Sequence, residues 1–213
     1  MPSLVGSEMC IRDRAIELFT EGSLNTFAKP TNVDTNSRIL CYDIRDLGRQ
    51  LLPVGMLVVL DSIFNRIIRN RQQGRNTWIY IDEIYLLFQH EYSANFLFTL
   101  WKRVRKYRAC CTGITQNVDD LLQSHTARTM LANSEFLVML NQAATDRTEL
   151  ARLLNISDNQ LSYITNVDSG RGLIKCGSAI VPFMDNFPKN RLYRLMTTRP
   201  SDTDGSHAPG RAA

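Results

Sequence analysis

Two carboxylates follow directly on a short apolar run near the middle of the chain. The run is Trp78–Ile81, and the acids are Asp82 and Glu83. In an open parallel sheet, ligands bind beyond the carboxyl ends of the strands, so a strand ending here would place both acids beside a ligand. Asp82 could then hold the water shell of a Mg²⁺ ion that bridges two phosphates, and Glu83 could act as general base on an attacking water. This is the Walker B pattern with a catalytic glutamate, although two solvated acids at a helix start would give the same string.

A second polar group follows the next apolar run of the chain. That run, Ala109–Thr115, leads into Gln116 and Asn117. A neutral amide both donates and accepts hydrogen bonds, so Gln116 could contact a γ-phosphate and the attacking water together. The same residues also fit an ordinary polar turn in which Asn117 caps a helix. Taken with the acid pair, this strand end predicts an ATP site in which Asp82 and Thr115 bind the Mg²⁺-nucleotide.

Basic residues are dense just before that second run. They are Lys102, Arg103, Arg105, Lys106 and Arg108. A guanidinium from this stretch could neutralise charge on the γ-phosphate of a neighbouring subunit, and Arg105 and Arg108 are our candidates for such an arginine finger. The stretch equally fits a solvated helix face, or a DNA contact, since Trp101 and Tyr107 interleave the charges. Three further arginines suit the finger as well: Arg128, Arg147 and Arg171.

The elements that must position these groups predict an α/β fold. The predicted strands cover residues 38–42, 77–81, 109–115 and 135–140. The predicted helices cover residues 50–71, 93–106, a segment from 118, 145–154 and 157–164, with Ser93 and Ser157 as N-caps. Strands that alternate with helices are typical of a parallel sheet covered on both faces, and the unbroken apolar runs predict strands buried on both sides. A hairpin around Gly177 and a last strand over 192–198 complete the prediction.

Composition excludes several classes of protein. The 213 residues are 44% apolar, which fits one α/β domain, and the net charge of +4 is too weak to indicate nucleic-acid binding alone. The longest apolar stretch, 51–68, is interrupted by Pro53, Gly55 and charged residues, so we expect no membrane span, which needs about 20 apolar residues. Five cysteines without metal-ligand spacing, among them Cys110 and Cys111, predict reduced, buried thiols in a cytosolic protein.

Several motifs in order resemble the conjugation and type IV secretion ATPases of the TrbE/TraC type. They are YDIR (42–45), YIDEIYLLF (80–88), WKRVRKYR (101–108), GITQNVDDLL (113–122) and LNQAATDRTELARLL (140–154). The resemblance spans about residues 35–199. It implies a RecA-like P-loop NTPase core of the HerA/FtsK-like superfamily, binding of ATP and Mg²⁺, and a hexamer. It also implies a place at the cytoplasmic face of the inner membrane, beside the channel components of a type IV secretion system.

One departure from that family bears directly on activity. No G-x-x-x-x-G-K-[ST] motif occurs in the sequence. In the family this loop precedes the Walker B strand, so we expect an N-terminally truncated domain that lacks most of its phosphate affinity and does not hydrolyse ATP by itself. Two alternatives remain open: a coupling ATPase that pumps DNA, and a non-catalytic module kept for ring assembly.

Local composition and the extent of the resemblance suggest where the domain begins and ends. Residues 1–14 contain LVGSEMCIRDR, which resembles a translated sequencing adapter, so we expect this segment to be an artefact. Residues 15–36, rich in Gly, Ser, Asn and Thr, read as a linker. The partial P-loop ATPase domain is then expected over 37–199, followed by a disordered tail over 200–213.

Overall fold

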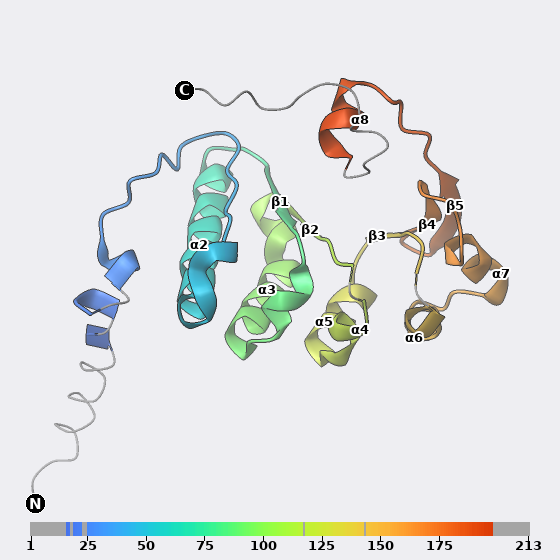
Figure 1. The fold of residues 1–213 in the computed structure, drawn as a ribbon, viewed down its shortest axis with the longest axis horizontal. Helices are drawn as coiled ribbons and strands as arrows, with labels where there is room; N and C mark the ends of the chain where they lie inside the picture. Colours follow the sequence, from blue (N-terminus) through green and yellow to red (C-terminus); the bar gives the residue numbers. More distant parts are fainter. Residues whose placement is uncertain (1–15, 18, 23–24, 117, 143, 198–213) are drawn as a thin grey trace, which may run out of the picture. The chain divides into compact units, whose positions relative to one another are not determined.

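The computed structural model describes residues 16–17, 19–22, 25–116, 118–142 and 144–197. The predicted adapter at 1–14 and the predicted tail at 200–213 lie outside these residues. The chain divides into two compact units, Met1–Asn117 and Val118–Ala213. Unit 1 is coloured blue to green and unit 2 yellow to red in Figure 1.

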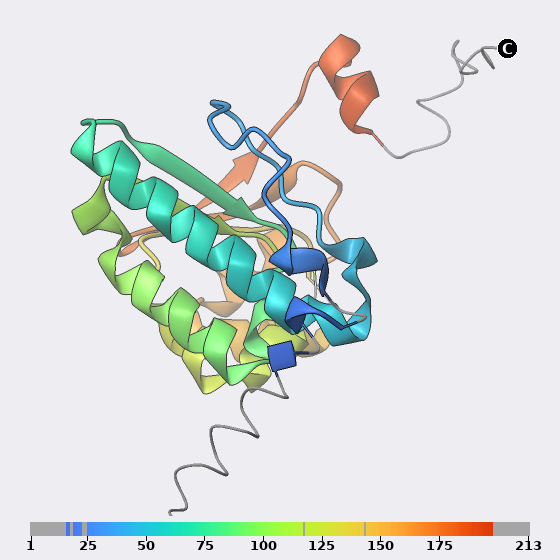
Figure 2. The ribbon, with the colours of Figure 1, turned by 90° about the vertical axis from the view of Figure 1, so that its left-hand side faces the viewer.

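A two-stranded parallel sheet forms the centre of unit 1. Strand β1 (Thr77–Ile81) pairs with β2 (Ala109–Gly113), from Thr77 opposite Ala109 to Ile81 opposite Gly113. The helices α2 (Gly48–Gln72) and α3 (Glu91–Arg103) lie side by side in Figure 2. Their buried residues pack on one face of the sheet, forming a core of Ile67, Ile79, Leu100 and Ala109. The predicted β1 and the predicted helix over 50–71 are confirmed.

Within the described part of unit 1, only one face of this sheet is covered. Trp78 is 64% exposed and Tyr80 is 67% exposed, whereas Ile79 between them is buried. Cys110, on the neighbouring strand, is exposed as well. The prediction of strands buried on both faces is therefore wrong for the chain as described, and so is the prediction that Cys110 is a core residue. Cys41 and Cys176 are also exposed, and Cys111 is half-buried.

The prediction that the chain has no possible membrane span needs a correction at helix α2. Its segment Gln50–Gln72 is long and apolar enough, by length and composition alone, to cross a membrane, so Pro53 and the charged residues do not exclude a span as expected. A core helix passes the same test, and Leu60 and Ile67 of α2 are buried within unit 1. Composition alone therefore does not assign this helix to a membrane.

Unit 2 is built on a three-stranded antiparallel sheet. Its strands, β3 (Phe136–Met139), β4 (Arg171–Cys176) and β5 (Ala179–Met184), lie in the order β3-β4-β5. The predicted hairpin is confirmed, with Gly177 at φ 56° in its turn. The strand at 135–140 was predicted as part of the parallel alternation, but β3 pairs antiparallel with β4 instead.

Helices cover one face of this second sheet. They are α4 (Val118–Gln123), α5 (His125–Ala132), α6 (Ala144–Leu154) and α7 (Asp158–Leu161). Ile164 and Leu173 are fully buried in their shared core, together with Met139 and Leu150. Ser157 caps α7 through a capping box with Gln160, as its position in the sequence predicted.

Two predicted strands are absent. Residues 38–42 form no strand, and Ile39 is 84% exposed. The segment contacts α2 instead, since the Tyr42 hydroxyl lies 2.9 Å from the Ser62 hydroxyl, and the Arg66 guanidinium donates to the carbonyls of Thr35 and Ser37 just before it. Residues 192–197, predicted as strand, lie largely in α8 (Arg191–Met196), because the Asn190 side chain accepts from the Tyr193 N–H at 3.0 Å and caps a helix.

Short 3₁₀ helices connect several of these elements. They are η1 (Asn25–Ala28), η2 (Arg45–Leu47), η3 (Ile84–Phe88), η4 (Val104–Tyr107) and η5 (Ser162–Ile164). Helix α3 begins at Glu91, two residues before the predicted cap. Ser93 is buried inside the helix and its hydroxyl donates to the carbonyl of Leu87 at 2.5 Å, which ties α3 to η3.

Candidate functional site

The acid pair forms a turn between the end of β1 and η3. The Ile114 N–H donates to the Ile81 carbonyl at 2.8 Å, and the Ile84 N–H donates to the Ile114 carbonyl at 2.9 Å. Ile81 and Ile84 are thus both hydrogen-bonded to Ile114. Asp82 and Glu83, which lie between them, are left out of the ladder. A turn at the carboxyl end of a parallel strand lies where ligands of open parallel sheets bind.

The backbone of Glu83 is strained. Its φ and ψ are both 48°, the left-handed conformation, and Glu has no special tolerance for it. Such a conformation costs on the order of 1–3 kcal/mol and persists where the surroundings impose it, often at functional sites. The Glu83 N–H donates to the Asp82 carboxylate at 3.1 Å, so the first acid supports the turn that presents the second.

One oxygen of the Glu83 carboxylate lacks a partner. Its Oε2 is buried and accepts no hydrogen bond from the residues that the structure describes. A buried acceptor left unsatisfied costs about 1–3 kcal/mol, and more when charged. The atom is therefore suited to accept a hydrogen bond from a water or a hydrated ligand.

The neighbouring strand brings its polar end to the same place. Thr115 and Gln116 directly follow Ile114, and β1 and β2 run parallel in register. The structure therefore brings Asp82, Glu83, Thr115 and Gln116 to one end of the sheet, with Asp82 and Gln116 exposed and the other two half-buried.

These donors fit Mg²⁺ and a phosphate chain. Carboxylate and hydroxyl oxygens are the hard ligands that Mg²⁺ prefers. Within the described ranges no group of three or more His, Cys, Asp or Glu could hold a metal. Mg²⁺ commonly binds through one or two carboxylates plus substrate phosphates, so the donor set suits a metal that arrives with a nucleotide.

Gly113 makes room for the Ile84 side chain after the turn, and its role was not predicted from the sequence. A Cβ on Gly113 would lie 2.6 Å from Cδ1 of Ile84, which is buried. The Ile84 side chain thus packs against the β2 backbone and fixes the residue that follows Glu83. The signal was available: a glycine inside a strand pattern often marks a close approach.

Arg105 and Arg108 lie at the opposite end of the sheet. Arg108 directly precedes β2, its carbonyl accepts from the Thr77 N–H at 3.1 Å, and its guanidinium donates to the Gly74 carbonyl at 3.3 Å. Five strand residues at about 3.3 Å each separate this end from the acid pair by roughly 16 Å. Arg105 lies in η4, beside Arg108. An arginine finger from either residue therefore stays a prediction about a neighbouring subunit.

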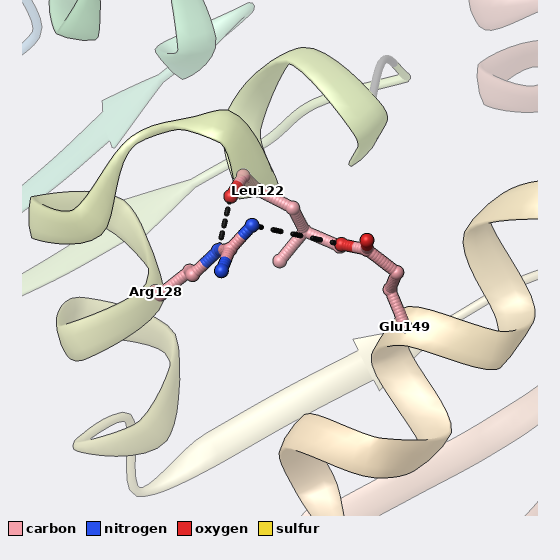
Figure 3. Close-up of polar contacts among 3 residues, drawn as sticks. All are labelled: Leu122, Arg128 and Glu149. Atoms are coloured by element: carbon pink, nitrogen blue, oxygen red, sulfur yellow. Dashed lines mark hydrogen bonds and ion pairs between the residues drawn. The ribbon is translucent and has the colours of Figure 1, made fainter.

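The other candidate arginines have partners inside unit 2. Arg128 donates to the Leu122 carbonyl, and its Nη2 lies 3.8 Å from the Glu149 carboxylate (Figure 3). Arg171 lies 3.7 Å from Asp168. The Arg147 guanidinium donates to the Thr165 hydroxyl, while its buried Nε has no partner among the described residues. Each would have to leave these contacts to serve as a finger, which stays untested.

Comparison with known proteins finds a family and similar solved structures. Residues 30–173 match the family model of the TraG P-loop domain. Among solved structures, that of VirB4 of Thermoanaerobacter pseudethanolicus is similar, with a TM-score of 0.71 and 25% identity, over 84% of this chain and 50% of that chain. The chain thus spans half the length of this relative. No curated protein matches.

Proposed function

The chain belongs to the TraG P-loop domain family, and from this premise we propose that it is the Walker B part of an ATPase that powers type IV secretion or conjugative transfer. The predicted α/β P-loop NTPase fold is confirmed by the similarity to VirB4. The observation that carries the proposal is the Asp82–Glu83 turn, with its strained backbone and a buried carboxylate oxygen that has no partner among the described residues.

Each group at the sheet end has a chemical task in this proposal. Glu83 accepts the proton of the attacking water at Oε2, which has no competing donor. Gln116 orients the water and the γ-phosphate, because an amide both donates and accepts. Asp82 would hold Mg²⁺ and Thr115 would contact the nucleotide. When bound, Mg²⁺ neutralises charge on the phosphates.

The phosphate-binding loop has to come from elsewhere, since the sequence contains none. Backbone N–H groups and a lysine of such a loop supply most of the affinity for phosphates. We therefore expect no ATP turnover by the 213 residues alone. Activity belongs to a polypeptide that also carries the loop.

The test is a chimaera in which this chain replaces the matched half of VirB4 of Thermoanaerobacter pseudethanolicus. We expect Glu83→Gln to lower steady-state ATP turnover by about 10²–10⁴-fold, the usual contribution of a general base. ATP binding should change little, because Gln keeps the shape of Glu. The matched control is Glu91→Gln, an exposed acid in the first turn of α3, which should keep turnover within about twofold.

A Glu83→Gln chimaera that keeps more than a tenth of the turnover would contradict the assignment of the base. Asp82→Asn should instead raise the Mg²⁺ concentration needed for half-maximal turnover. This change separates the metal-binding role from the proton-accepting role.

Oligomeric assembly is the remaining part of the proposal. The similarity to VirB4 supports an oligomeric component of a secretion system. We extend this to a hexamer at the cytoplasmic face of the membrane, in contact with channel components. In such a ring Arg105 or Arg108 would reach the site of the next subunit. Mixed rings that combine Glu83→Gln subunits with Arg105→Ala or Arg108→Ala subunits test this point by complementation.

A further inference from the structure

The turn that presents Glu83 continues into η3, and η3 is held at both of its ends. The Leu86 N–H donates to the Glu83 carbonyl at 3.0 Å, so Glu83 opens the first turn of this 3₁₀ helix. At the far end, the Leu87 carbonyl accepts from the Ser93 hydroxyl of α3 at 2.5 Å. A displacement of η3 would therefore reach the backbone of Glu83.

Ser93 is the one buried polar side chain among the residues that the structure describes, with 3% of its surface exposed. A serine inside a helix usually turns its hydroxyl back to a carbonyl three or four residues earlier, and the contact with the His90 carbonyl at 3.0 Å is of this local kind. The hydroxyl carries a single hydrogen, however, and its shorter contact goes to Leu87, six residues earlier and in η3. This bond therefore ties two elements together.

The near end of η3 is held by β2 and the residue after it. The buried Ile84 donates its N–H to the Ile114 carbonyl at 2.9 Å, and a Cβ on Gly113 would lie 2.6 Å from the Ile84 Cδ1. A strained backbone persists only where its surroundings impose it. For Glu83 these surroundings are the β2 backbone at one end of η3 and the Ser93 hydroxyl at the other.

We propose that Ser93 is a positioning residue for Glu83: its hydroxyl holds η3 so that Glu83 keeps its left-handed backbone and presents its carboxylate at the sheet end. The inference rests on the proposed function, since it adds a residue that supports the general base. Loss of the hydroxyl removes a donor from the carbonyl of the buried Leu87, which is unfavourable for a buried acceptor. The end of η3 then loosens, and Glu83 relaxes to an unstrained conformation.

The first test uses the 213-residue chain and needs no catalysis. A positive φ brings the amide and α protons of a residue close together, so the nuclear Overhauser effect between these two protons of Glu83 reports its left-handed conformation. We expect Ser93→Ala to weaken this signal at least twofold. The hydrogen-exchange rate of the Ile84 amide, which is bonded to Ile114, should rise at least tenfold. Ser93→Thr retains a hydroxyl and should restore both readouts.

The matched control is Asn70→Ala. It removes another side-chain hydrogen bond of unit 1, from the Asn70 amide to the Thr77 hydroxyl at 2.9 Å, which lies at the opposite end of β1 from the acid pair. The Glu83 and Ile84 readouts should stay within twofold of the unsubstituted chain. Thr99→Ala removes an exposed hydroxyl from the same helix as Ser93, and it should leave both readouts unchanged as well.

Unchanged Glu83 and Ile84 readouts in a folded Ser93→Ala chain would overturn the proposal. Equal changes in Asn70→Ala would overturn it too, because they would show a general loosening of unit 1. If Ser93→Ala does not fold, Ser93→Cys takes its place, since a thiol is a weaker donor of similar size. Its readouts should change in the same direction, and readouts equal to those of the unsubstituted chain would again overturn the proposal.

The link to catalysis is tested in the same chimaera as Glu83→Gln. Ser93→Ala should lower kcat about tenfold and leave KM for ATP within twofold, because it displaces the base and not the nucleotide. Ser93→Thr should restore most of the turnover, whereas full turnover in Ser93→Ala would overturn the role of Ser93 in the reaction. If Glu83→Gln keeps its turnover while Ser93→Ala still changes the Glu83 readout, the proposed function fails and the control of the turn by Ser93 stands.

Discussion

The two sheets of the molecule differ in how much of their structure is stabilised by local features such as tight turns and helix caps. In unit 2, β4 and β5 are joined by a tight turn, and three helix starts carry side-chain caps: Ser124, Ser157 and Asn190. In unit 1 the strands β1 and β2 are separated by α3, and neither α2 nor α3 has a side-chain cap at its start.

The difference concerns function as much as stability. The sheet of unit 1, which has fewer of these turns and caps, is the one whose strand ends carry the acid pair and the amide. A parallel strand pair leaves its carboxyl ends open to a ligand, whereas a hairpin closes the end at which its turn lies. The candidate site therefore lies on the sheet whose two strands are joined through a long connection that contains α3.

The largest expected effect concerns the core of unit 2. Leu173→Ala removes a fully buried side chain from β4 and should lower the free energy of unfolding by about 2–5 kcal/mol. Val181→Ala, on the adjacent strand and 56% exposed, should cost less than about 0.5 kcal/mol. Urea denaturation and hydrogen exchange over β3–β5 would measure both. A large cost at Val181 would show that the second face of this sheet is covered too, and would weaken the contrast.

Replacing Gly172 by alanine should destabilise the protein more than replacing Gly113. A Cβ on Gly172 would lie 2.2 Å from the Met139 carbonyl oxygen, which is backbone, whereas a Cβ on Gly113 would meet side-chain atoms of Ile84, the nearest at 2.6 Å. We expect Gly172→Ala to cost about 3 kcal/mol and Gly113→Ala about 1 kcal/mol, because a side chain can move and a ladder carbonyl cannot. Denaturant midpoints of the two variants measure this, and the reverse order would contradict the packing described here.

The smallest expected effects concern the helix caps. Ser157→Ala removes the capping box of α7 and should cost about 1 kcal/mol. His90→Ser would give α3 the cap that it lacks, and should stabilise unit 1 by several tenths of a kcal/mol to about 1 kcal/mol. Thermal denaturation of both variants tests whether the missing cap of α3 lowers the stability of unit 1. If His90→Ser does not stabilise the protein, the difference in helix caps between the two units has no effect on stability.

The sequence by itself determined the local features of this protein. The bounds of β1, the turn at Gly177 and the cap at Ser157 follow from propensity and turn chemistry within a few residues. The position of the acid pair and of Gln116 at strand ends could also be predicted, because an apolar run indicates the strand that precedes each of them.

Only the tertiary structure decided the features that depend on distant neighbours. Residues 38–42 have strand composition but no strand partner, and β3 pairs with a hairpin that lies more than thirty residues later. The left-handed backbone of Glu83 arises because Ile114 holds both Ile81 and Ile84. The exposure of Trp78 could not be predicted either, because an unbroken apolar strand predicts burial on both faces.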